Sequence, residues 1–301
     1  RYGVMLREDG IVFDDGTTTR ISENHYHMTT TTAQAPAVLS HLEYYLQVVW
    51  PELNVNVVST TEQWAGAAIA GPKSRELLSK LFSDKDISNE GLPFMGYMEA
   101  DLFGIPARIF RISFSGELAY EINVASDFGT FMWEKTIEQG QQFNIQPYGT
   151  EALSNLRIEM GHVAGPELDG RTIPYDVSLE GLVSKKKDFV GKRSLNRKAF
   201  TSSTRQRVVG LVPIDKKTVI PEGSHLVKDA KAKLPNPKLG HISSSCWSVE
   251  YNNPFALAIL QNGKNMIGEK LYAFSPLQNK TIPVEIVSSH YVDPKGERVR
   301  S

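Results

Sequence analysis

Cysteine is almost absent from this sequence, since Cys246 is the only one among 301 residues. A single cysteine cannot form a disulfide within the chain, and it excludes a metal site built from several cysteines. This composition is typical of a protein that works in a reducing, cytoplasmic setting.

Long hydrophobic runs are missing as well. No apolar stretch approaches the roughly 20 residues that a membrane-spanning helix needs, and the first residues show no basic segment followed by an apolar one. We therefore expect no membrane partner. The sequence opens on a strand-like run at Arg1 without an initiator methionine, which predicts a missing N-terminal segment.

Neither sign of charge is in excess. Lysine and arginine number 33 against 34 acids, for a formal net charge of −1. A balanced charge gives no reason to expect nucleic acid as a partner. Small molecules or proteins are the remaining partner classes.

Several familiar catalytic motifs are also lacking. The sequence has no G-x-S-x-G, no H-E-x-x-H and no G-x-G-x-x-G after a predicted strand. His25 and His27 share one face of a predicted strand, but no third metal ligand accompanies them. We therefore expect no metal site.

Among the features that are present, two acids and a glycine follow an early apolar run. Residues 10–13 predict a strand, and Asp14-Asp15-Gly16 predicts a tight turn that leaves a carboxylate at the strand end. Two interpretations are open at this point: an ordinary turn, or a ligand site that contains Asp15.

The first 160 residues mix strands and helices, which predicts an α+β domain with antiparallel sheets. The predicted strands are residues 2–6, 10–13, 25–32, 55–60, 64–70, 95–102, 107–113 and 120–124, and the predicted helices are residues 34–49, 73–82, 128–140 and 149–161.

Two charged residues in these elements are candidates for a site. Glu121 lies on the strand face opposite Tyr120, and burying it requires a donor partner. The alternative is an exposed strand face. Arg157, in the last predicted helix of the domain, is either a ligand contact or a surface charge.

Helices disappear from residue 206 onward, where strands alternate with turns. The predicted strands are residues 207–213, 238–245, 255–260 and 281–288. This pattern indicates a C-terminal all-β domain of barrel or sandwich type. We place the boundary so that residues 1–200 form the first domain and residues 201–301 the second.

An ordered set of short motifs extends along the chain: Met5-Leu6, Gly10-Ile11-Val12-Phe13-Asp14-Asp15, Ala70-Gly71-Pro72, Leu92-Pro93-Phe94-Met95, Phe114-Ser115-Gly116-Glu117 with Glu121, Leu156-Arg157 with Glu159 and Gly161, Pro174, Asp188-Phe189 with Gly191-Lys192, and Gly240 with Ile242 and Ser244-Ser245. Their order and spacing resemble the aminomethyltransferase family, which has the glycine-cleavage T-protein fold. The resemblance implies a folate-binding α+β domain, whose N-terminal part lies upstream of Arg1, followed by a β-barrel of jelly-roll type.

The resemblance also implies a tetrahydrofolate site. Asp15 matches the family acid that acts on the folate amines during one-carbon transfer. Glu121 matches the family acid that binds the pterin. A carboxylate suits this role because it can accept hydrogen bonds from the adjacent exocyclic amine and ring N–H of the pterin. Thr31, Tyr120 and Arg157 match further positions of the folate site.

Within the family, six stretches are similar to the sarcosine oxidase α-subunit branch: Thr29-Thr30-Thr31-Thr32, Thr61-Glu62-Gln63-Trp64, Phe114-Ser115-Gly116-Glu117-Leu118, Gly149-Thr150-Glu151-Ala152-Leu153, Lys187-Asp188-Phe189-Val190-Gly191-Lys192-Arg193-Ser194-Leu195 and Ser244-Ser245-Cys246-Trp247-Ser248. That branch implies transfer of the one-carbon unit of a sarcosine-derived iminium to tetrahydrofolate, giving 5,10-methylenetetrahydrofolate. Flavin and NAD would then lie in other modules or subunits, and the partners would be folate, a small one-carbon donor and other oxidase subunits.

Two departures separate the sequence from T-proteins that serve a lipoyl carrier. Ala152-Leu153-Ser154 stands where they carry Ala-Arg-Asp, and Thr31 replaces an asparagine. The alternatives left open are a stand-alone T-protein or a folate-linked demethylase. A third, of another class, is a non-catalytic folate-binding factor for iron–sulfur assembly, whose Lys-Gly-Cys-Tyr-x-Gly-Gln-Glu motif does not surround Cys246.

Overall fold

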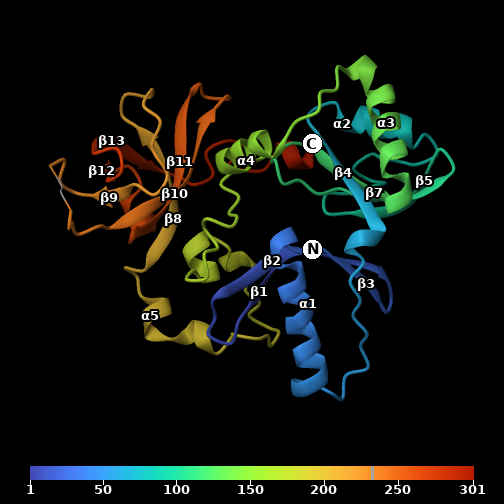
Figure 1. Ribbon diagram of the computed structural model, residues 1–301, viewed down its shortest axis with the longest axis horizontal. Coiled ribbons are helices and arrows are strands. Elements are labelled where there is room, and N and C mark those ends of the chain that lie inside the picture. Colours follow the sequence, from blue (N-terminus) through green and yellow to red (C-terminus); the bar gives the residue numbers. More distant parts are fainter. Residues whose placement is uncertain (232–233) are drawn as a thin grey trace. The chain divides into compact units, whose positions relative to one another are not determined.

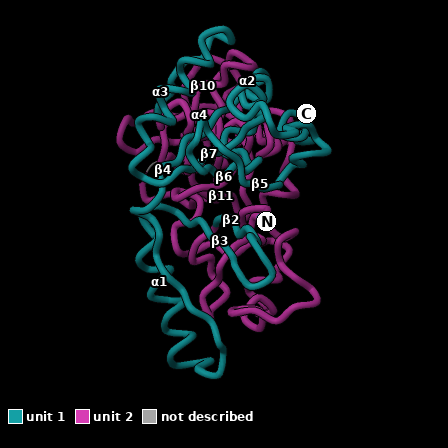
Figure 2. The backbone as a smooth tube through the Cα atoms, turned by 90° about the vertical axis from the view of Figure 1, so that its right-hand side faces the viewer, with its two compact units in different colours: residues 1, 16–149, 295–301 teal, residues 2–15, 150–294 magenta. Residues whose placement is uncertain are grey.

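The structure is a computed structural model that describes residues 1–231 and 234–301. The chain forms two compact units (Figure 2). Unit 1 contains residue 1, residues 16–149 and residues 295–301, and unit 2 contains residues 2–15 and 150–294. The division therefore falls between Asp15 and Gly16, inside one strand.

Unit 1 is built around a four-stranded antiparallel sheet with the order β4-β7-β6-β5 (Figure 1). Its strands are β4 (Trp64–Ala70), β5 (Tyr97–Leu102), β6 (Ile105–Phe110) and β7 (Ala119–Ala125). Successive side chains of a strand point to opposite faces, so β7 divides its residues between a core face and a second face. The core face buries Tyr120, Ile122 and Val124, and Glu121 lies on the other.

Two helices cover the core face of this sheet. They are α2 (Ser74–Leu81) and α3 (Gly129–Gly140). Leu78 and Met132 pack there with Tyr120 and Ile122 in one apolar cluster. The predicted strand and helix positions in residues 64–140 are thus confirmed to within a few residues at each end.

The remaining elements of unit 1 are the later part of β2 (Val12–Ser22), then β3 (His25–Met28) and α1 (Ala35–Tyr44), which continues as the π-helical turn η2 (Tyr45–Val49). The expected turn at residues 14–16 is wrong, because β2 continues through it without a break. Beyond Gly16 the strand is held by Thr29, whose main-chain N–H donates to the Thr17 oxygen (2.8 Å) and whose side-chain oxygen accepts from the Thr17 N–H (3.1 Å).

Two further predictions about strands are wrong. The strand expected over 25–32 ends at Met28, and residues 32–34 form the short 3-10 turn η1 (Thr32–Gln34). Residues 55–60 carry no regular element. Their valines are exposed, so the β-branched residues there have no sheet to join.

Unit 2 contains β1 (Tyr2–Leu6), α4 (Thr150–Glu159), α5 (Lys198–Thr201) and a closed six-stranded barrel (Figure 1). The barrel strands are β8 (Gln206–Pro213), β9 (His225–Val227), β10 (Gly240–Ser248), β11 (Asn253–Gln261), β12 (Lys270–Ser275) and β13 (Lys280–Val287). They follow the order β10-β11-β8-β13-β12-β9, with Leu211, Ala258 and Ile286 in the interior. The predicted barrel is confirmed.

The predicted domain boundary between residues 200 and 201 does not coincide with a boundary between the two compact units. Residues 200 and 201 both belong to unit 2, and the barrel itself begins at Gln206. The boundary therefore stays a prediction. Among the described residues, no helix has both the length and the apolar character needed to cross a membrane.

Candidate functional site

Asp15 is held by a hydroxyl donor in unit 2. The Tyr2 hydroxyl donates a hydrogen bond of 2.7 Å to Oδ2 of Asp15. Burial raises the pKa of the Asp15 carboxyl, the Tyr2 hydrogen bond lowers it, and the nearby Asp14 carboxylate raises it again. The net result is a raised pKa, which suits a carboxyl group that exchanges a proton.

Tyr2 also links Asp15 to a buried polar network. Its ring lies 5.8 Å from the His162 ring, and the main-chain oxygen of His162 accepts a bond from Nη1 of Arg157 (3.3 Å). Burial, together with the charge of Arg157, lowers the pKa of His162 to about 4. His162 is therefore neutral near pH 7.

The guanidinium of Arg157 is taken up by protein partners. Nη1 pairs with Oε2 of Glu167 at 2.8 Å, and Nη2 donates to the Ser244 hydroxyl at 2.8 Å. Glu167 is fully buried and also accepts bonds from Ser243 and Ser244. The surface-charge alternative for Arg157 is thus wrong, and its folate contact stays a prediction.

Glu121 is the second candidate carboxylate, and it belongs to unit 1. It faces Ala68 on β4 and Phe110 on β6 across the antiparallel register. Its side chain is partly buried and has no hydrogen-bond or ion-pair partner among the residues that the structure describes. Burial raises its pKa, and its charge contributes to the raised pKa of Tyr148.

Aromatic rings lie on the same face of the sheet as Glu121, and the sequence reasoning missed them. Tyr97 lies opposite Phe110 in the register, with their ring centroids 5.1 Å apart. The His27 ring stacks on Phe110 at 5.7 Å with an interplanar angle of 26°. A carboxylate and aromatic rings thus share this face of the sheet through a cross-strand pairing that the sequence did not specify.

Tyr120 and Thr31 do not lie on the same sheet face as Glu121. The Tyr120 ring is fully buried in the unit 1 core, and its hydroxyl accepts a bond of 3.0 Å from Nε of Arg75. Thr31 is exposed ahead of η1, and its main-chain oxygen accepts from the N–H of Gln34 (2.9 Å). Tyr120 is thus placed to support Glu121 in β7, and the folate contacts of both residues stay predictions.

Within each unit, the candidates are grouped as follows. Asp15 and Arg157 belong to unit 2 and are linked through Tyr2 and His162. Glu121 belongs to unit 1, as do Tyr120 and Thr31. In the described part of the chain, no cluster of three or more histidine, cysteine or acidic residues could hold a metal ion.

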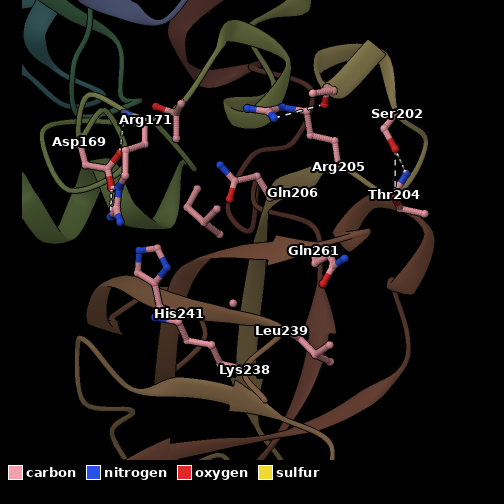
Figure 3. A pocket seen from close by; sticks show the side chains of 14 residues that line it. Asp169, Arg171, Ser202, Thr204, Arg205, Gln206, Lys238, Leu239, His241 and Gln261 are labelled. Atoms are coloured by element: carbon pink, nitrogen blue, oxygen red, sulfur yellow. Dashed lines mark hydrogen bonds and ion pairs between the residues drawn. The ribbon is translucent and has the colours of Figure 1, made fainter. Parts of the chain in front are cut away.

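One cavity of about 640 Å³ lies within unit 2, beside the start of β10 and the end of β11 (Figure 3). Arg171 and Asp169 point toward each other on one side of it, and the His241 ring faces the space between them and the barrel. None of the predicted site residues lines this cavity.

The chain combines an antiparallel sheet covered by helices with a closed β-barrel, and each unit carries one candidate acid on a strand, Asp15 or Glu121. This combination is typical of a T-protein-like fold. Two family models match the chain: the GCVT N-terminal domain over residues 1–187 and the glycine cleavage T-protein C-terminal barrel domain over residues 206–293. The chain belongs to the glycine cleavage T-protein family, which is a family of aminomethyltransferases.

Among its relatives are sarcosine oxidase α subunits. The chain is 45% identical over 303 residues to the "Sarcosine oxidase subunit alpha" of Rhizobium meliloti (strain 1021), with 99% of this chain and 30% of that protein covered. The corresponding protein of Corynebacterium sp. (strain P-1) is 43% identical over 302 residues, with 99% and 31% covered. The chain thus spans less than a third of the length of these relatives.

More distant relatives share the family and the fold. An "Aminomethyltransferase" of Chloroherpeton thalassium is 28% identical over 275 residues, covering 90% of this chain and 72% of that protein. The solved glycine cleavage system aminomethyltransferase T of Bartonella henselae superposes with a TM-score of 0.78 at 21% identity, over 98% of this chain and 76% of that one. The predicted fold class is confirmed.

Proposed function

We propose that this chain is the folate-dependent one-carbon transfer domain of a sarcosine oxidase, which passes the one-carbon unit of a sarcosine-derived iminium to tetrahydrofolate. The observation that carries the proposal is Glu121, a partly buried carboxylate without a protein partner among the described residues. A buried charge needs a donor partner, and the adjacent N–H donors of a pterin supply a matching pair. The rings of Phe110, His27 and Tyr97 add apolar and stacking contacts on the same sheet face.

Asp15 is the proposed acid–base residue. The folate amines, when bound, supply the nucleophile for the one-carbon unit, and formation of the new C–N bond releases a proton from nitrogen. A carboxylate with a raised pKa can accept that proton. Tyr2 orients Oδ2 of Asp15 through its 2.7 Å hydrogen bond.

The sarcosine oxidase relatives favour this donor over a lipoyl-bound one, since they are 43–45% identical to the chain and the aminomethyltransferase is 28% identical. In the proposed protein, flavin and NAD lie in other modules or subunits, and those subunits deliver the iminium. Productive docking of a lipoyl carrier protein to this chain would instead support a stand-alone T-protein.

Replacement of Glu121 tests the pterin contact. We expect Glu121→Gln to weaken tetrahydrofolate binding by roughly 1 to 3 kcal/mol, because a charged hydrogen-bond acceptor is lost. Isothermal titration calorimetry of the 301-residue chain measures the change. Glu134→Gln, an exposed acid on α3 of the same unit, is the matched control and should bind as the wild type does. An unchanged affinity in Glu121→Gln would remove this residue from the site.

Replacement of Asp15 tests the chemical step. We expect Asp15→Asn to lower turnover by about 10²- to 10⁴-fold, since general acid–base groups contribute factors of that size. Folate affinity should change much less. Both are measured in the assembled oxidase, as formation of 5,10-methylenetetrahydrofolate from sarcosine and as the Kd of tetrahydrofolate. Equal losses of affinity and turnover would make Asp15 a binding group instead.

A further inference from the structure

The end of α1 and the segment that follows it expose a concentration of large apolar side chains in unit 1. Their exposed fractions lie between 37% and 76%, and the residues are Tyr44, Val48, Val49, Trp50, Leu53, Val55, Val57 and Val58. In contrast, α1 buries only Val38 and η2 buries only Tyr45. Apolar side chains gathered in this way mark a surface that another molecule covers.

Residues 53–58 have the pattern of a β-strand that has no sheet to join. Leu53, Val55 and Val57 alternate with Asn54 and Asn56, so one face of an extended chain is apolar here and the other is polar. The β-branched valines favour such a strand. In the structure, however, these residues carry no regular element, and the segment runs as a coil from η2 toward β4 (Figure 1).

The main chain of this segment is also unpaired. The N–H groups of Asn54 and of residues 56–60 donate no hydrogen bond to any residue that the structure describes. A row of free N–H and C=O groups is a template on which a further strand can pair. The exposed side chains and the open main chain therefore point to the same kind of occupant, a β-strand.

The charge of this stretch is of one sign. Between Arg20 and Lys73 the sequence has no lysine and no arginine, whereas the acids Glu43, Glu52 and Glu62 are all exposed. A second copy of the same surface would place acids against acids, which is unfavourable. A strand with apolar side chains and neighbouring basic residues is complementary to it.

We propose that residues 53–58 become a β-strand in the intact protein, paired with a strand from a part of the same polypeptide that lies outside residues 1–301. The occupant carries apolar side chains toward Val55 and Val57 and basic side chains, at least one lysine among them, toward the acids of this stretch. The choice of the same polypeptide rests on the proposed function, in which this chain is one domain of a larger oxidase. Further polypeptide accompanies this fold in relatives of both kinds, since the chain covers 30% of the sarcosine oxidase α subunit and 76% of the solved aminomethyltransferase.

Amide hydrogen exchange at single-residue resolution tests the pairing. In the 301-residue chain, we expect the amides of residues 56–58 to exchange at about the rate of an unstructured peptide, because their N–H groups have no partner among the described residues. In the assembled oxidase, exchange at alternate residues, either 56 and 58 or 57, should be at least about 100-fold slower, as in a hydrogen-bonded strand. Equally fast exchange in the two samples would overturn the proposal.

Proline substitutions distinguish strand pairing from burial alone. Proline lacks the N–H, and a strand with one neighbouring strand directs only alternate N–H groups toward it. In the assembled oxidase, one of Asn56→Pro and Val57→Pro should therefore accelerate exchange at the neighbouring protected residues at least about tenfold more than the other does. In the 301-residue chain, both should leave the urea midpoint unchanged. Equal effects of the two variants in the oxidase would exclude a strand paired on one side.

Val55→Lys tests the apolar face and the charge of the occupant together. Val55 is 53% exposed and Val219, in unit 2, is 54% exposed, so Val219→Lys is the matched control. In the assembled oxidase, Val55→Lys should accelerate exchange at residues 56–58 about tenfold, since it buries a charge beside basic residues. Val55→Glu should do so less, and Val219→Lys not at all. A stronger effect of Val55→Glu than of Val55→Lys would contradict a basic occupant.

A zero-length cross-link identifies the source of the strand. A carbodiimide joins the carboxylates of Glu43, Glu52 or Glu62 to a lysine amine in contact with them, and mass spectrometry of the linked peptides identifies the partner. We expect a linked lysine in the same polypeptide and outside residues 1–301. Glu43→Gln, Glu52→Gln and Glu62→Gln together should abolish the link. No such link, or a lysine in a separate subunit or in a second copy of this chain, would overturn the proposed occupant.

Folate binding is measured separately, so the two proposals can fail independently. If Glu121→Gln leaves the affinity for tetrahydrofolate unchanged while residues 56–58 are protected in the oxidase, the proposed function fails and the strand pairing stands. If Glu121→Gln weakens folate binding while these residues exchange freely in the oxidase, the pairing fails and the proposed function stands.

Discussion

At the scale of single residues, Asp15 and Glu121 differ in what surrounds them. Asp15 accepts a hydrogen bond from Tyr2, whereas Glu121 has no donor among the described residues. Burial raises the pKa of both carboxyls. The difference matches the proposed roles, since a binding carboxylate must keep its acceptors free for the ligand and an acid–base group must be held in place.

Tyr2→Phe isolates the hydroxyl from the ring. We expect this variant to raise the pKa of Asp15 further, because the Tyr2 hydrogen bond that favours the charged carboxylate is lost. The acidic limb of the pH–turnover profile should move to higher pH with it. Tyr26→Phe, on an exposed side chain of β3, serves as the control.

The ring of Tyr2 stays in place in this variant, so its contact with His162 is kept. A loss of turnover without a shift of the acidic limb would show that the hydroxyl contacts the substrate and does not tune Asp15.

At the scale of elements, periodicity and apolar runs predicted most of the fold, because α2 and α3 bury an apolar face and the strands β8, β10, β11 and β13 bury apolar residues. It failed where a long-range contact decides the conformation. Residues 14–16 have the composition of a turn, yet the hydrogen bonds between Thr17 and Thr29 keep β2 extended. No local pattern contains that pairing.

The candidate site was predictable only in part for the same reason. The family motifs identified Asp15 and Glu121, and both have surroundings that suit a site. The Tyr2 hydroxyl, the His27–Phe110 stack and the Arg157–Glu167 pair join residues that are 13, 83 and 10 positions apart in the sequence. Such contacts depend on strand register and loop closure, which single-sequence patterns do not specify.

Gly16 allows the close approach that replaces the expected turn. A Cβ at this position would collide with the main-chain carbonyl of Thr29. We expect Gly16→Ala to destabilise the protein by about 1 to 3 kcal/mol, as overpacking against a fixed backbone does. Urea denaturation monitored by circular dichroism measures the change.

The matched control for this prediction is Gly3→Ala in β1, where a Cβ meets no atom within 4 Å. Its effect should stay within about 0.5 kcal/mol. Equal stabilities of the two variants would mean that β2 and β3 can separate at Gly16 without cost.

At the scale of the whole molecule, the described histidines give the stability a definite pH dependence. Burial lowers the pKa of His27, His162, His241 and His290 below the ordinary value of 6.5. The unfolded chain therefore binds protons at these positions before the folded chain does, and stability falls as the pH decreases below about 6.5. The raised pKa values of Asp15 and Glu121 act in the opposite direction, at pH values between those raised pKa values and the ordinary values of 3.8 and 4.5.

His162 should contribute most, since its pKa falls to about 4. The stability it provides is complete above pH 6.5 and is lost as the pH falls toward 4, which amounts to about 1 to 2 kcal/mol at pH 5. We expect His162→Gln to flatten the stability profile between pH 7 and 5. Urea midpoints measured at half-unit pH steps provide the comparison. If the His162→Gln profile is as steep as that of the wild type, the pH dependence arises from the other three histidines. The neutral imidazole of His162 then does not contribute to the loss of stability in acid.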